Sequence, residues 1–507
     1  MMRSLYSGVA GLKTHQTKMD VIGNNIANVN TVGFKSSSVT FSDLLYQTTQ
    51  SASGANTDTG TTGVNAKQIG LGSKVNSIAT SQTTGGTQTT DSALDCMING
   101  DAYFIVKSGG QNYFTKAGSF FVDGTGTLCT ASGAAVQGWQ VNETGTDIER
   151  DTVSNLNVMS AENMTTSPEA TTNTYITGNI DTTDSQLDPD DGKGASAAVN
   201  FYDALGNSYT LKLAVTSDYT ENAGEKTVTD GAYRVAVSDV WDADGNSIFY
   251  SKKDDGTYEL NANMSITIDG ITYKAQYGKD STGAEDKKQV EIVPDDATKY
   301  IPLSFSTATG AFQSVNNSTD ADNDHKSVSF IINDASKGLD ANGNNTSPFR
   351  EVEVDFSSLT QYASNGKSAL ESQRGKTDGT GEGAGRPMGN MTGLSIDQEG
   401  KIYGSYDNGV TKLLGQIAVT TFANATGLEA VGNSMFAATQ NSGEFDGVGK
   451  SITESGGSLT TGALEMSNVD LSAEFTNMIT TQRGFQANSR IITTSDTMLE
   501  ELINLKR

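Results

Sequence analysis

Apolar residues recur every seven positions at both ends of the chain. Near the N-terminus the column at this spacing is Leu5, Leu12, Met19 and Ile26, and Ile22 widens it. Near the C-terminus an equivalent column contains Leu471, Met478, Phe485, Ile492 and Leu499, and Phe475 thickens its start. A seven-residue repeat is the periodicity of coiled-coil helices, so the pattern predicts helices over residues 1–30 and 468–507.

Both apolar stripes are narrow, because polar residues such as Gln482, Ser489 and Asp496 flank the C-terminal column. A narrow stripe suits a coiled-coil seam better than the wider face that a helix buries in a globular core. Two amphipathic helices packed on one ordinary domain would give a similar pattern, so that alternative stays open. No further helical segment is apparent to complete a bundle, and a lone helix pair is marginal in water. We therefore expect both ends to be poorly ordered in the free chain and to fold when they meet partners.

The long middle of the chain alternates apolar and polar residues, as half-buried strands do. The alternation is clearest in "YTLKLAV" (209–215), "ITYKAQY" (271–277) and "EVEVDF" (351–356). Turn signals separate such segments, for example "LGN" at 205–207 and "DADGN" at 242–246. The pattern predicts mainly β outer domains, built as antiparallel barrels or sandwiches, plus terminal α-helices that form a coiled coil. The whole is expected to be multidomain and elongated.

These elements predict a nested domain organisation. A low-complexity stretch at 48–66 marks a linking region, which we expect to be extended, with a disordered linker as the alternative. The predicted parts are the terminal helices (1–30 and 468–507), the linking arm (31–88), a discontinuous β domain (89–150 and 375–467), and one or two outer β domains inserted in it (151–374).

Composition narrows the class of protein. Glycine occurs 55 times and proline 6 times in 507 residues, which suits short strands joined by tight turns. The formal net charge of −26 argues against nucleic acid and anionic membranes as partners. No run approaches the roughly 18 apolar residues of a membrane span, so we expect no membrane insertion. The start "MMRSLYSGVAGLKTH" lacks the apolar core of a signal peptide, so the chain is expected to stay inside the cell or to leave without a cleaved leader.

The chain offers little material for catalysis. His15, in the predicted N-terminal helix, and His325, in the acidic loop "DADNDHK", are the only histidines, and both are expected to be surface residues. Nothing in the pattern assembles a nucleophile, a base and an oxyanion site, so we expect no enzyme, no catalytic residue, no metal site and no cofactor. The two cysteines, Cys96 and Cys129, allow one disulfide, but two free buried thiols are favoured.

Both ends of the chain resemble a known family. Residues 4–35, "SLYSGVAGLKTHQTKMDVIGNNIANVNTVGFK", resemble the N-terminal signature of the bacterial flagellar axial proteins, which are rod, hook and hook–filament junction subunits. Residues 471–507, "LSAEFTNMITTQRGFQANSRIITTSDTMLEELINLKR", resemble the matching C-terminal signature. The residues taken as the family motif are Asn24, Asn25, Asn28, Gly33, Phe34 and Lys35.

Three internal segments resemble the hook subunits of that family. They are "YFTKAGSFFVDGTGTLCTASGAAVQGW" (113–139), "FYDALGNSYTLKL" (201–213) and the segment 396–439, which begins "IDQEGKIYGSY". Distal rod subunits share the two ends but are much shorter, so the chain length and the "DALGN" segment favour the hook. Cys96 and Cys129 lie within segments that resemble the family, at positions expected to be ordinary core or turn residues.

The resemblance implies a structural subunit that polymerises into a curved, flexible tube. Such a tube carries an export channel and acts as a universal joint between rod and filament. The implied partners are copies of the chain itself, rod, hook-cap and hook–filament junction proteins, and the flagellar export apparatus. The implied location is the hook of the basal body, outside the cell and reached without a cleaved signal peptide. The expected assembly interface consists of Leu5, Leu12, Met19, Ile22, Ile26, Leu471, Phe475, Met478, Phe485, Ile492 and Leu499.

Two alternatives remain at this point. A distal-rod-type axial subunit would share both ends and form a straight, rigid tube. A surface-displayed binding module outside the flagellum would be a β protein whose ends merely pair, and its termini would be ordered in a stable monomer.

Overall fold

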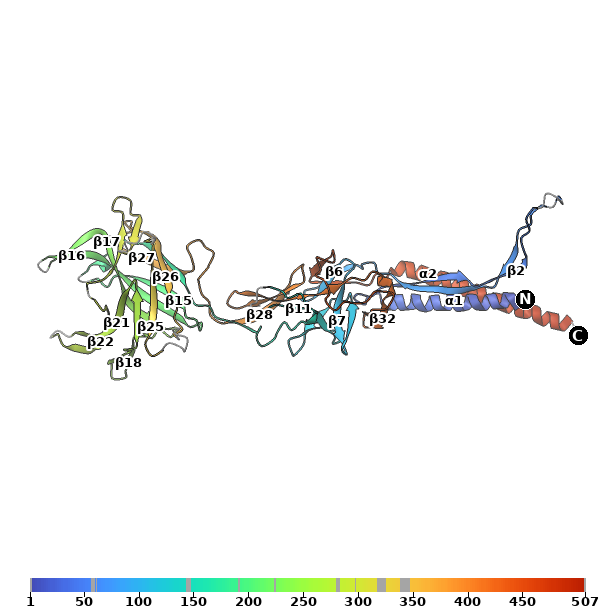
Figure 1. Ribbon diagram of the computed structural model, residues 1–507, viewed down its shortest axis with the longest axis horizontal. Helices are drawn as coiled ribbons and strands as arrows, with labels where there is room; N and C mark the ends of the chain where they lie inside the picture. The colour runs from blue at the N-terminus through green and yellow to red at the C-terminus, as the bar shows by residue number, and fades with distance from the viewer. Residues whose placement is uncertain are drawn as a thin grey trace. The chain divides into compact units, whose positions relative to one another are not determined.

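The computed structural model of the chain divides into two compact units (Figure 1). Unit 1 consists of Met1–Met164, Met391–Tyr406 and Val410–Arg507, and unit 2 of Thr165–Asn390 and Asp407–Gly409. The inserted part therefore begins and ends some way downstream of the 151–374 expected from the sequence. The structure describes residues 2–55, 60, 62–142, 147–189, 192–222, 225–279, 283–296, 298–316, 325–337 and 347–505.

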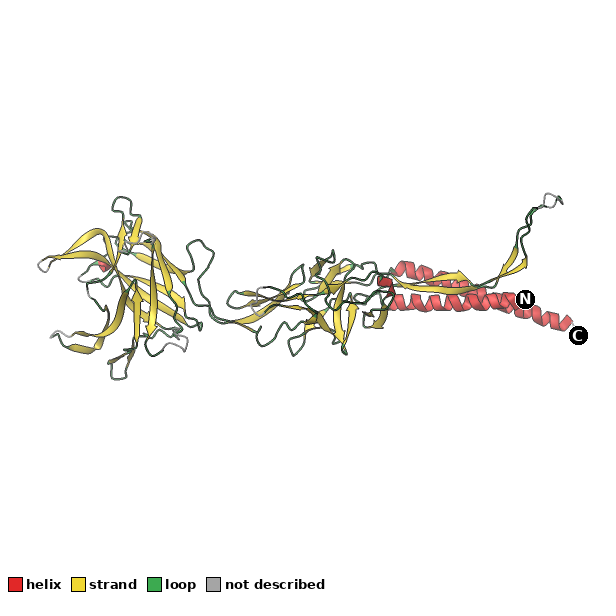
Figure 2. Cartoon of the chain, in the orientation of Figure 1, coloured by secondary structure: helices red, strands yellow, loops and turns green. Residues whose placement is uncertain are grey.

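Two long helices form where the seven-residue repeats predict them (Figure 2). Helix α1 spans Met2–Ala27 and helix α2 spans Leu471–Leu505. They run antiparallel, since Ser4 Oγ near the start of α1 lies 3.3 Å from Ser495 Oγ near the end of α2. Asp470 precedes α2, and its Oδ1 accepts hydrogen bonds from the N–H groups two and three residues further on, as an N-cap does.

The arm that follows α1 is a two-stranded antiparallel ribbon. The part of the ribbon formed by residues 37–43 and 73–80 lies along α1, where Thr14 Oγ1 is 3.4 Å from Ser73 Oγ. In the part further from the helix, formed by residues 46–50 and 67–70, all strand residues are exposed. Within the described residues, the arm is therefore ordered β structure rather than a disordered linker. The paired strands are β1 (Ser37–Asp43) with β4 (Ser73–Thr80), and β2 (Tyr46–Gln50) with β3 (Lys67–Gly70).

The rest of unit 1 is a β domain whose largest sheet has the order β28-β29-β30-β11-β7-β8-β33-β32. Its core contains buried Phe104, Val106 and Ile402 on one side and Tyr103 and Trp139 in a second cluster. These strands are β28 (Gly389–Ile396), β29 (Lys401–Tyr406), β30 (Thr411–Ile417), β11 (Ala135–Gln140), β7 (Tyr103–Ser108), β8 (Gln111–Thr115), β33 (Met435–Ala437) and β32 (Glu429–Gly432). Attached to them are β9 (Phe120–Val122), β10 (Leu128–Thr130), β12 (Ser154–Asn155) and β31 (Val419–Thr420).

Two short strand pairs bring the two ends of the chain together in this β domain. β5 (Thr87–Thr89) pairs with β35 (Ala463–Glu465), and β6 (Cys96–Asn99) pairs with β34 (Ser458–Thr461). In each pair one strand follows the ribbon and the other precedes α2. The segments that lead to α1 and α2 therefore leave the β domain side by side.

Unit 2 is a sandwich of two sheets around one apolar cluster. Both sheets contribute to that cluster, for example Phe330 and Ile266 from one and Leu213 and Leu303 from the other. The segments 209–215, 271–277 and 351–356, predicted as strands, lie in or largely within strands of these sheets. All pairings are antiparallel except that of β14 with β26.

The larger sheet of unit 2 has the order β22 (Glu285–Pro294), β21 (Ile271–Lys279), β20 (Met264–Ile268), β25 (Ser327–Asp334), β26 (Val352–Thr360), β14 (Asn173–Asn179) and β27 (Ala369–Arg374). The smaller sheet has the order β15 (Ala195–Tyr202), β16 (Ser208–Asn222), β17 (Glu225–Trp241), β23 (Ile301–Phe305) and β24 (Phe312–Val315). Outside both sheets, β18 (Tyr250–Lys252) pairs with β19 (Tyr258–Leu260), and β13 (Thr165–Thr166) pairs with the start of β28. Short 3-10 helices occupy Ser185–Leu187 and Ala425–Gly427.

Asp181 connects the end of β14 to the loop between β26 and β27 through hydrogen bonds. Its Oδ1 accepts hydrogen bonds from the N–H and hydroxyl of Thr183, and its Oδ2 accepts from the N–H groups of Ser364 and Gly366. These bonds favour the charged carboxylate and hold the pKa of Asp181 well below its ordinary value. A carboxylate that is satisfied only in the folded state stabilises the fold.

We predict that Asp181→Asn lowers the melting temperature of unit 2 at neutral pH, because an amide cannot accept all of these bonds. The folded pKa lies below the unfolded value near 4. The stabilisation is therefore present above that value and is lost as the pH falls through the folded pKa. Calorimetry from neutral pH to about pH 2 should show the difference between variant and wild type shrinking in acid. A difference that stays constant with pH would contradict this role, and Asp254→Asn, at an exposed position of unit 2, is the matched control.

Candidate functional site: the terminal helices and their junction

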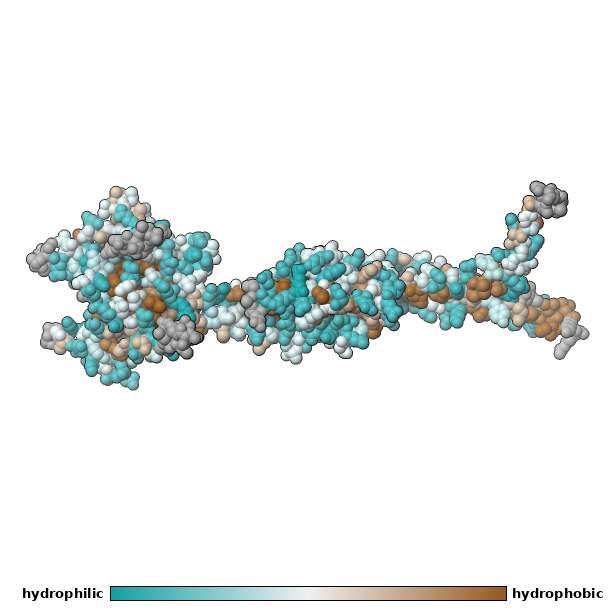
Figure 3. All heavy atoms as spheres, viewed as in Figure 1, coloured by the Kyte–Doolittle hydropathy of each residue, from teal (hydrophilic) through white to brown (hydrophobic). Residues whose placement is uncertain are grey.

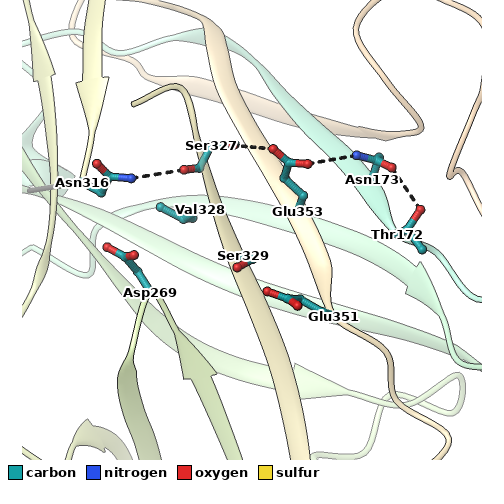
Figure 4. Close-up of a pocket in the computed structure, with 9 residues that line it drawn as sticks. All are labelled: Thr172, Asn173, Asp269, Asn316, Ser327, Val328, Ser329, Glu351 and Glu353. Carbon is teal, nitrogen blue, oxygen red and sulfur yellow. Dashed lines mark hydrogen bonds between the residues drawn. The ribbon is translucent and has the colours of Figure 1, made fainter. Parts of the chain in front are cut away.

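A pocket in unit 2 has a volume of about 450 Å³ and is lined by three carboxylates, Asp269, Glu351 and Glu353 (Figure 4). Glu353 already accepts hydrogen bonds from Ser327 Oγ and Asn173 Nδ2. Its lining, as far as the described residues form it, contains no histidine, cysteine or lysine. Among the described residues, no group of three or more His, Cys, Asp or Glu side chains is arranged to hold a metal ion. The more informative chemistry lies in unit 1.

Helices α1 and α2 meet along a seam of small and polar residues. A Cβ added to Gly11 would lie 2.7 Å from Asn488 Nδ2, and one added to Gly8 would lie 3.2 Å from Ile492 Cγ1. Ser4 and Ser495 continue the seam towards the end of the pair. Residues 4, 8, 11 and 15 follow alternate spacings of four and three, so the seam keeps the coiled-coil period. The absence of side chains at the glycines lets the two backbones approach closely.

Apart from Ile492, which packs against Gly8, the predicted apolar columns flank this seam instead of forming its centre. Of the predicted interface residues, Ile22 is buried, while Leu5, Leu12, Met19, Ile26, Met478, Ile492 and Leu499 are half-buried. Leu471, Phe475 and Phe485 are exposed. Much of the apolar surface of the columns therefore remains available within a single chain.

Further apolar side chains extend this exposed surface. Tyr6 on α1 and Ile479 on α2 were not expected to belong to it, yet they are 69% and 59% exposed. Hydrophobic residues gather over the helical part of unit 1 in the face drawn in Figure 3. None of the helices in the described residues is long and apolar enough to cross a membrane.

His15 lies where α1, α2 and β1 meet. A Cβ at Gly484 would lie 2.7 Å from His15 Cε1, and the ring of Phe41 packs edge-on with its centroid 5.7 Å from that of the imidazole. His15 is therefore half-buried rather than freely exposed as expected, because a glycine in the partner helix makes room for its ring. Burial, and after it the charge of Lys18, lowers the pKa of His15. The second histidine, His325, is half-buried.

The asparagines of the family motif hold the end of α1. Asn25 is fully buried; its Oδ1 accepts from Ser37 N, and its Nδ2 donates to Ser37 O and to Glu474 Oε1. One side chain thus joins α1, β1 and α2. Asn28 Nδ2 donates back to the carbonyl and side-chain oxygens of the exposed Asn24, which closes the last turn of α1.

Gly33 and Phe34 turn the chain into the β domain. Gly33 has a φ of +68°, and a Cβ there would lie 2.7 Å from the backbone N of Ala117. Only glycine fits that conformation and that space. The N–H of Gly33 donates to the carbonyl of Glu465, and the carbonyl of the half-buried Phe34 accepts from Asn468 N.

Lys35 then forms a buried ion pair. Its Nζ lies 2.6 Å from Glu465 Oε1 and 2.8 Å from the carbonyl of Thr83. The two side chains are 1% and 0% exposed. The same Oε1 also accepts the N–H of Gly85. Sequence reasoning marked Lys35 but missed Glu465, since nothing in the local pattern around this acid singles it out.

A second buried lysine lies close to this pair. Lys116 Nζ donates to the carbonyl of Gly100 and lies 5.1 Å from the ring centroid of Tyr103. Burial lowers the pKa of Lys116 to about 8, although the charge of Glu465 acts in the opposite direction. Burial also raises the pKa of Tyr103, whose hydroxyl donates to Gln82.

Both cysteines are buried and free. Burial raises the pKa of the Cys96 thiol to about 12 and also raises that of Cys129. Because the thiolate is the reactive form, neither thiol is set up as a nucleophile in this fold.

We predict opposite effects for the same substitution at two glycines of α1. Gly23 has open space around it, so Gly23→Ala should stabilise α1 by about 0.5–1 kcal/mol through helix propensity alone. Gly11→Ala should instead cost about 1–3 kcal/mol, because its methyl group displaces Asn488. Both changes in the stability of the helix pair can be measured by hydrogen exchange of α2 amides, under solution conditions in which these amides are protected in the wild type. Equal stabilisation by the two alanines would refute the close seam.

The lowered pKa of His15 predicts weaker helix packing in mild acid. The unfolded chain, with an ordinary His pKa near 6.5, binds a proton before the packed chain does. The stability of the packed helices should therefore fall as the pH drops below about 6.5. The same exchange measurement from about pH 8 to pH 5 should lose this slope in His15→Gln and keep it in His325→Gln. If the pH dependence of helix stability persists in His15→Gln, it arises from titratable groups other than His15.

Comparison with known families agrees with this geometry. A family model described as "Flagella basal body rod protein" matches residues 5–35, and one described as "Flagellar basal body rod FlgEFG protein C-terminal" matches residues 460–505. A third, "Flagellar hook protein FlgE/F/G D1 domain", matches residues 97–176. The matched segments include most of α1 with its motif, all of α2, and the first strands of the β domain.

Whole-chain relatives carry the same names. The chain is 33% identical to the flagellar hook protein FlgE of Treponema pallidum and 34% identical to that of Borreliella burgdorferi, with 100% of both chains covered in each case. It is 28% identical to the flagellar basal-body rod protein FlgG of Bacillus subtilis, again over 100% of both. A third of all positions shared with two hook proteins along the full length shows that the chain belongs to the flagellar hook and rod family of axial proteins.

Proposed function

We propose that this chain is a structural subunit of the bacterial flagellar hook and polymerises with copies of itself into a tube. The observation that carries the proposal is the apolar surface left on α1 and α2 after they have packed together. Phe475 and Ile479 are 50% and 59% exposed. So many large exposed apolar side chains gathered on two helices are unusual on a monomer and typical of an interface.

Burial of that surface would favour assembly. Removing one large apolar side chain from water contributes about 1.5–3 kcal/mol. Each subunit presents many such side chains on its two helices, and every one gains a partner only when further copies surround it. Part of the gain offsets the entropy lost when the helices become ordered. The balance favours helices that are fully stable only in the polymer.

The ribbon supports the same conclusion. Strands β2 and β3 are exposed throughout, and Leu45, Tyr46 and Ile69 project from this region with large exposed surfaces. An isolated two-stranded ribbon is marginal in water. Contact with neighbouring subunits would cover these side chains and stabilise the ribbon.

Family membership supports the finer features of the proposed role. The tube would contain an export channel, serve as a universal joint, and meet rod, hook-cap and hook–filament junction proteins at its two ends. Subunits would pass through the flagellar export apparatus without a cleaved leader and act outside the cell. The role is structural and involves no catalysis, and the absence of paired nucleophile and base in the carboxylate pocket of unit 2 is compatible with it.

A second candidate is a rod subunit that forms a straight tube. The Bacillus subtilis relative named as a rod protein aligns over its whole length, which favours this candidate. Negative-stain electron microscopy distinguishes the hook from the rod. The concentrated full chain is imaged and compared with a version that lacks residues 1–30 and 468–507. Curved tubes from the full chain alone support the hook, straight tubes support the rod, and tubes from the truncated chain would refute assembly through the helices.

We predict that Phe485→Asp abolishes polymer formation while both β units stay folded. A charge on the exposed rim of the apolar column would have to be buried without a partner when copies pack together. Val228→Asp in unit 2 places the same charge at another exposed apolar position and should leave assembly intact. Electron microscopy and circular dichroism measure the two effects. Intact tubes from Phe485→Asp would refute the assigned interface.

A further inference from the structure

The two ends of the chain converge on one buried ion pair. Lys35 follows α1, and Glu465 is the last residue of β35, shortly before α2. The two residues are 430 positions apart in the sequence, yet Nζ and Oε1 lie 2.6 Å apart. Neither side chain is more than 1% exposed. Each terminal segment therefore supplies one half of a charge pair that water does not reach.

Among the described residues, neither charge is hydrogen-bonded to a second group of opposite charge; the nearby Lys116, whose charge interacts with that of Glu465, donates to the carbonyl of Gly100 instead. Lys35 Nζ is otherwise bonded to the neutral carbonyl of Thr83. Glu465 Oε1 otherwise accepts only the N–H of Gly85, and Oε2 makes no hydrogen bond within the described part of the chain. Removing one member of a buried pair leaves the other as an uncompensated charge, which is far more costly than the loss of a surface pair.

Further hydrogen bonds join the same segments around the pair. Asn468 Oδ1 accepts from Ser36 N, and its Nδ2 donates to the carbonyls of Ser81 and Thr83. Gly33 N donates to the carbonyl of Glu465. We call the three segments 33–36, 81–85 and 465–468 the latch. The latch contains residues from both terminal segments and from the segment that follows β4, the returning strand of the ribbon.

We propose that the latch couples the two terminal segments, so that neither helix keeps its place on the β domain unless the segment leading to the other is docked. Undocking of residues 33–36 would leave Glu465 buried without its cation, and undocking of 465–468 would leave Lys35 without its anion. The two ends are then docked together or released together. The use of this coupling rests on the proposed function, in which both ends are released for export and dock in the polymer. The coupling itself is a property of the single chain.

Hydrogen exchange with mass spectrometry on the full-length chain tests the coupling. Lys35→Met should speed exchange at least about 100-fold in 81–87 and 462–468 and at the start of α2, although none of these residues is altered. Strands β7 and β11 should keep their protection. Lys35→Met combined with Glu465→Gln removes both charges and keeps an acceptor for Gly85 N, so it should restore most of the protection. Arg150→Met breaks an exposed pair with Glu454, whose side chains are 47% and 51% exposed, and should change nothing at the latch.

Several results would overturn the proposal. Faster exchange confined to 33–37 in Lys35→Met would make the pair a local contact, and loss of protection in β7 and β11 as well would make it a general determinant of the fold. A double variant no better protected than Lys35→Met would show that unpaired charge is not the cause. A wild-type chain with unprotected amides at 81–87 would show that the latch is open in the free subunit. None of these results depends on tube formation, so failure of the proposed function would be seen separately.

Discussion

The buried contact between Lys35 and Glu465 is the constraint on which the placement of both chain ends depends. A charged pair at 1% and 0% exposure is stable only while each charge keeps its partner. The local structure on either side serves that requirement. Gly33 takes up a positive φ against Ala117 so that the next residues can enter the β domain, and Asn25 then fixes α1 to β1 and α2. The direction in which the helices leave the domain follows from these few contacts.

Different residues of the two helices serve two different contacts: one set packs α1 against α2 within a chain, and the other is left for contact between chains. Ser4, Gly11 and Asn488 fit closely and specifically within one chain, whereas a seam made only of leucine would accept many apolar helices equally well. The apolar columns remain on the flanks, where Phe475 and Ile479 are exposed. In the proposed polymer, the small polar seam would therefore define the helix pair and the apolar columns would join one pair to the next.

Sequence periodicity was sufficient to predict the two helices, three of the strand segments and the mainly β class, because spacing along the chain reports which face of an element is buried. It did not predict the seam, since Gly8 and Gly11 read as weak helix positions until the partner helix is known. The partial burial of His15 was not predicted for the same reason, because the space for its ring is created by Gly484 on the other helix. The resemblance to the family identified Asn25, Gly33 and Lys35 as motif residues but did not explain what these side chains do in the structure. The reason is tertiary: each contacts a segment that is distant in the sequence.

The distribution of charge explains why assembly would depend so strongly on the helices. Unit 2 carries most of the excess negative charge of a chain whose net charge is −26, so the second units of neighbouring copies repel one another. The first 40 residues are instead basic, with Arg3, Lys13, Lys18 and Lys35 against Asp20. Neighbouring copies would therefore attract one another through apolar burial on their terminal helices and repel one another through the charge of unit 2. Contacts between second units would then be weak, and a tube held together by its helices would bend without separating its subunits.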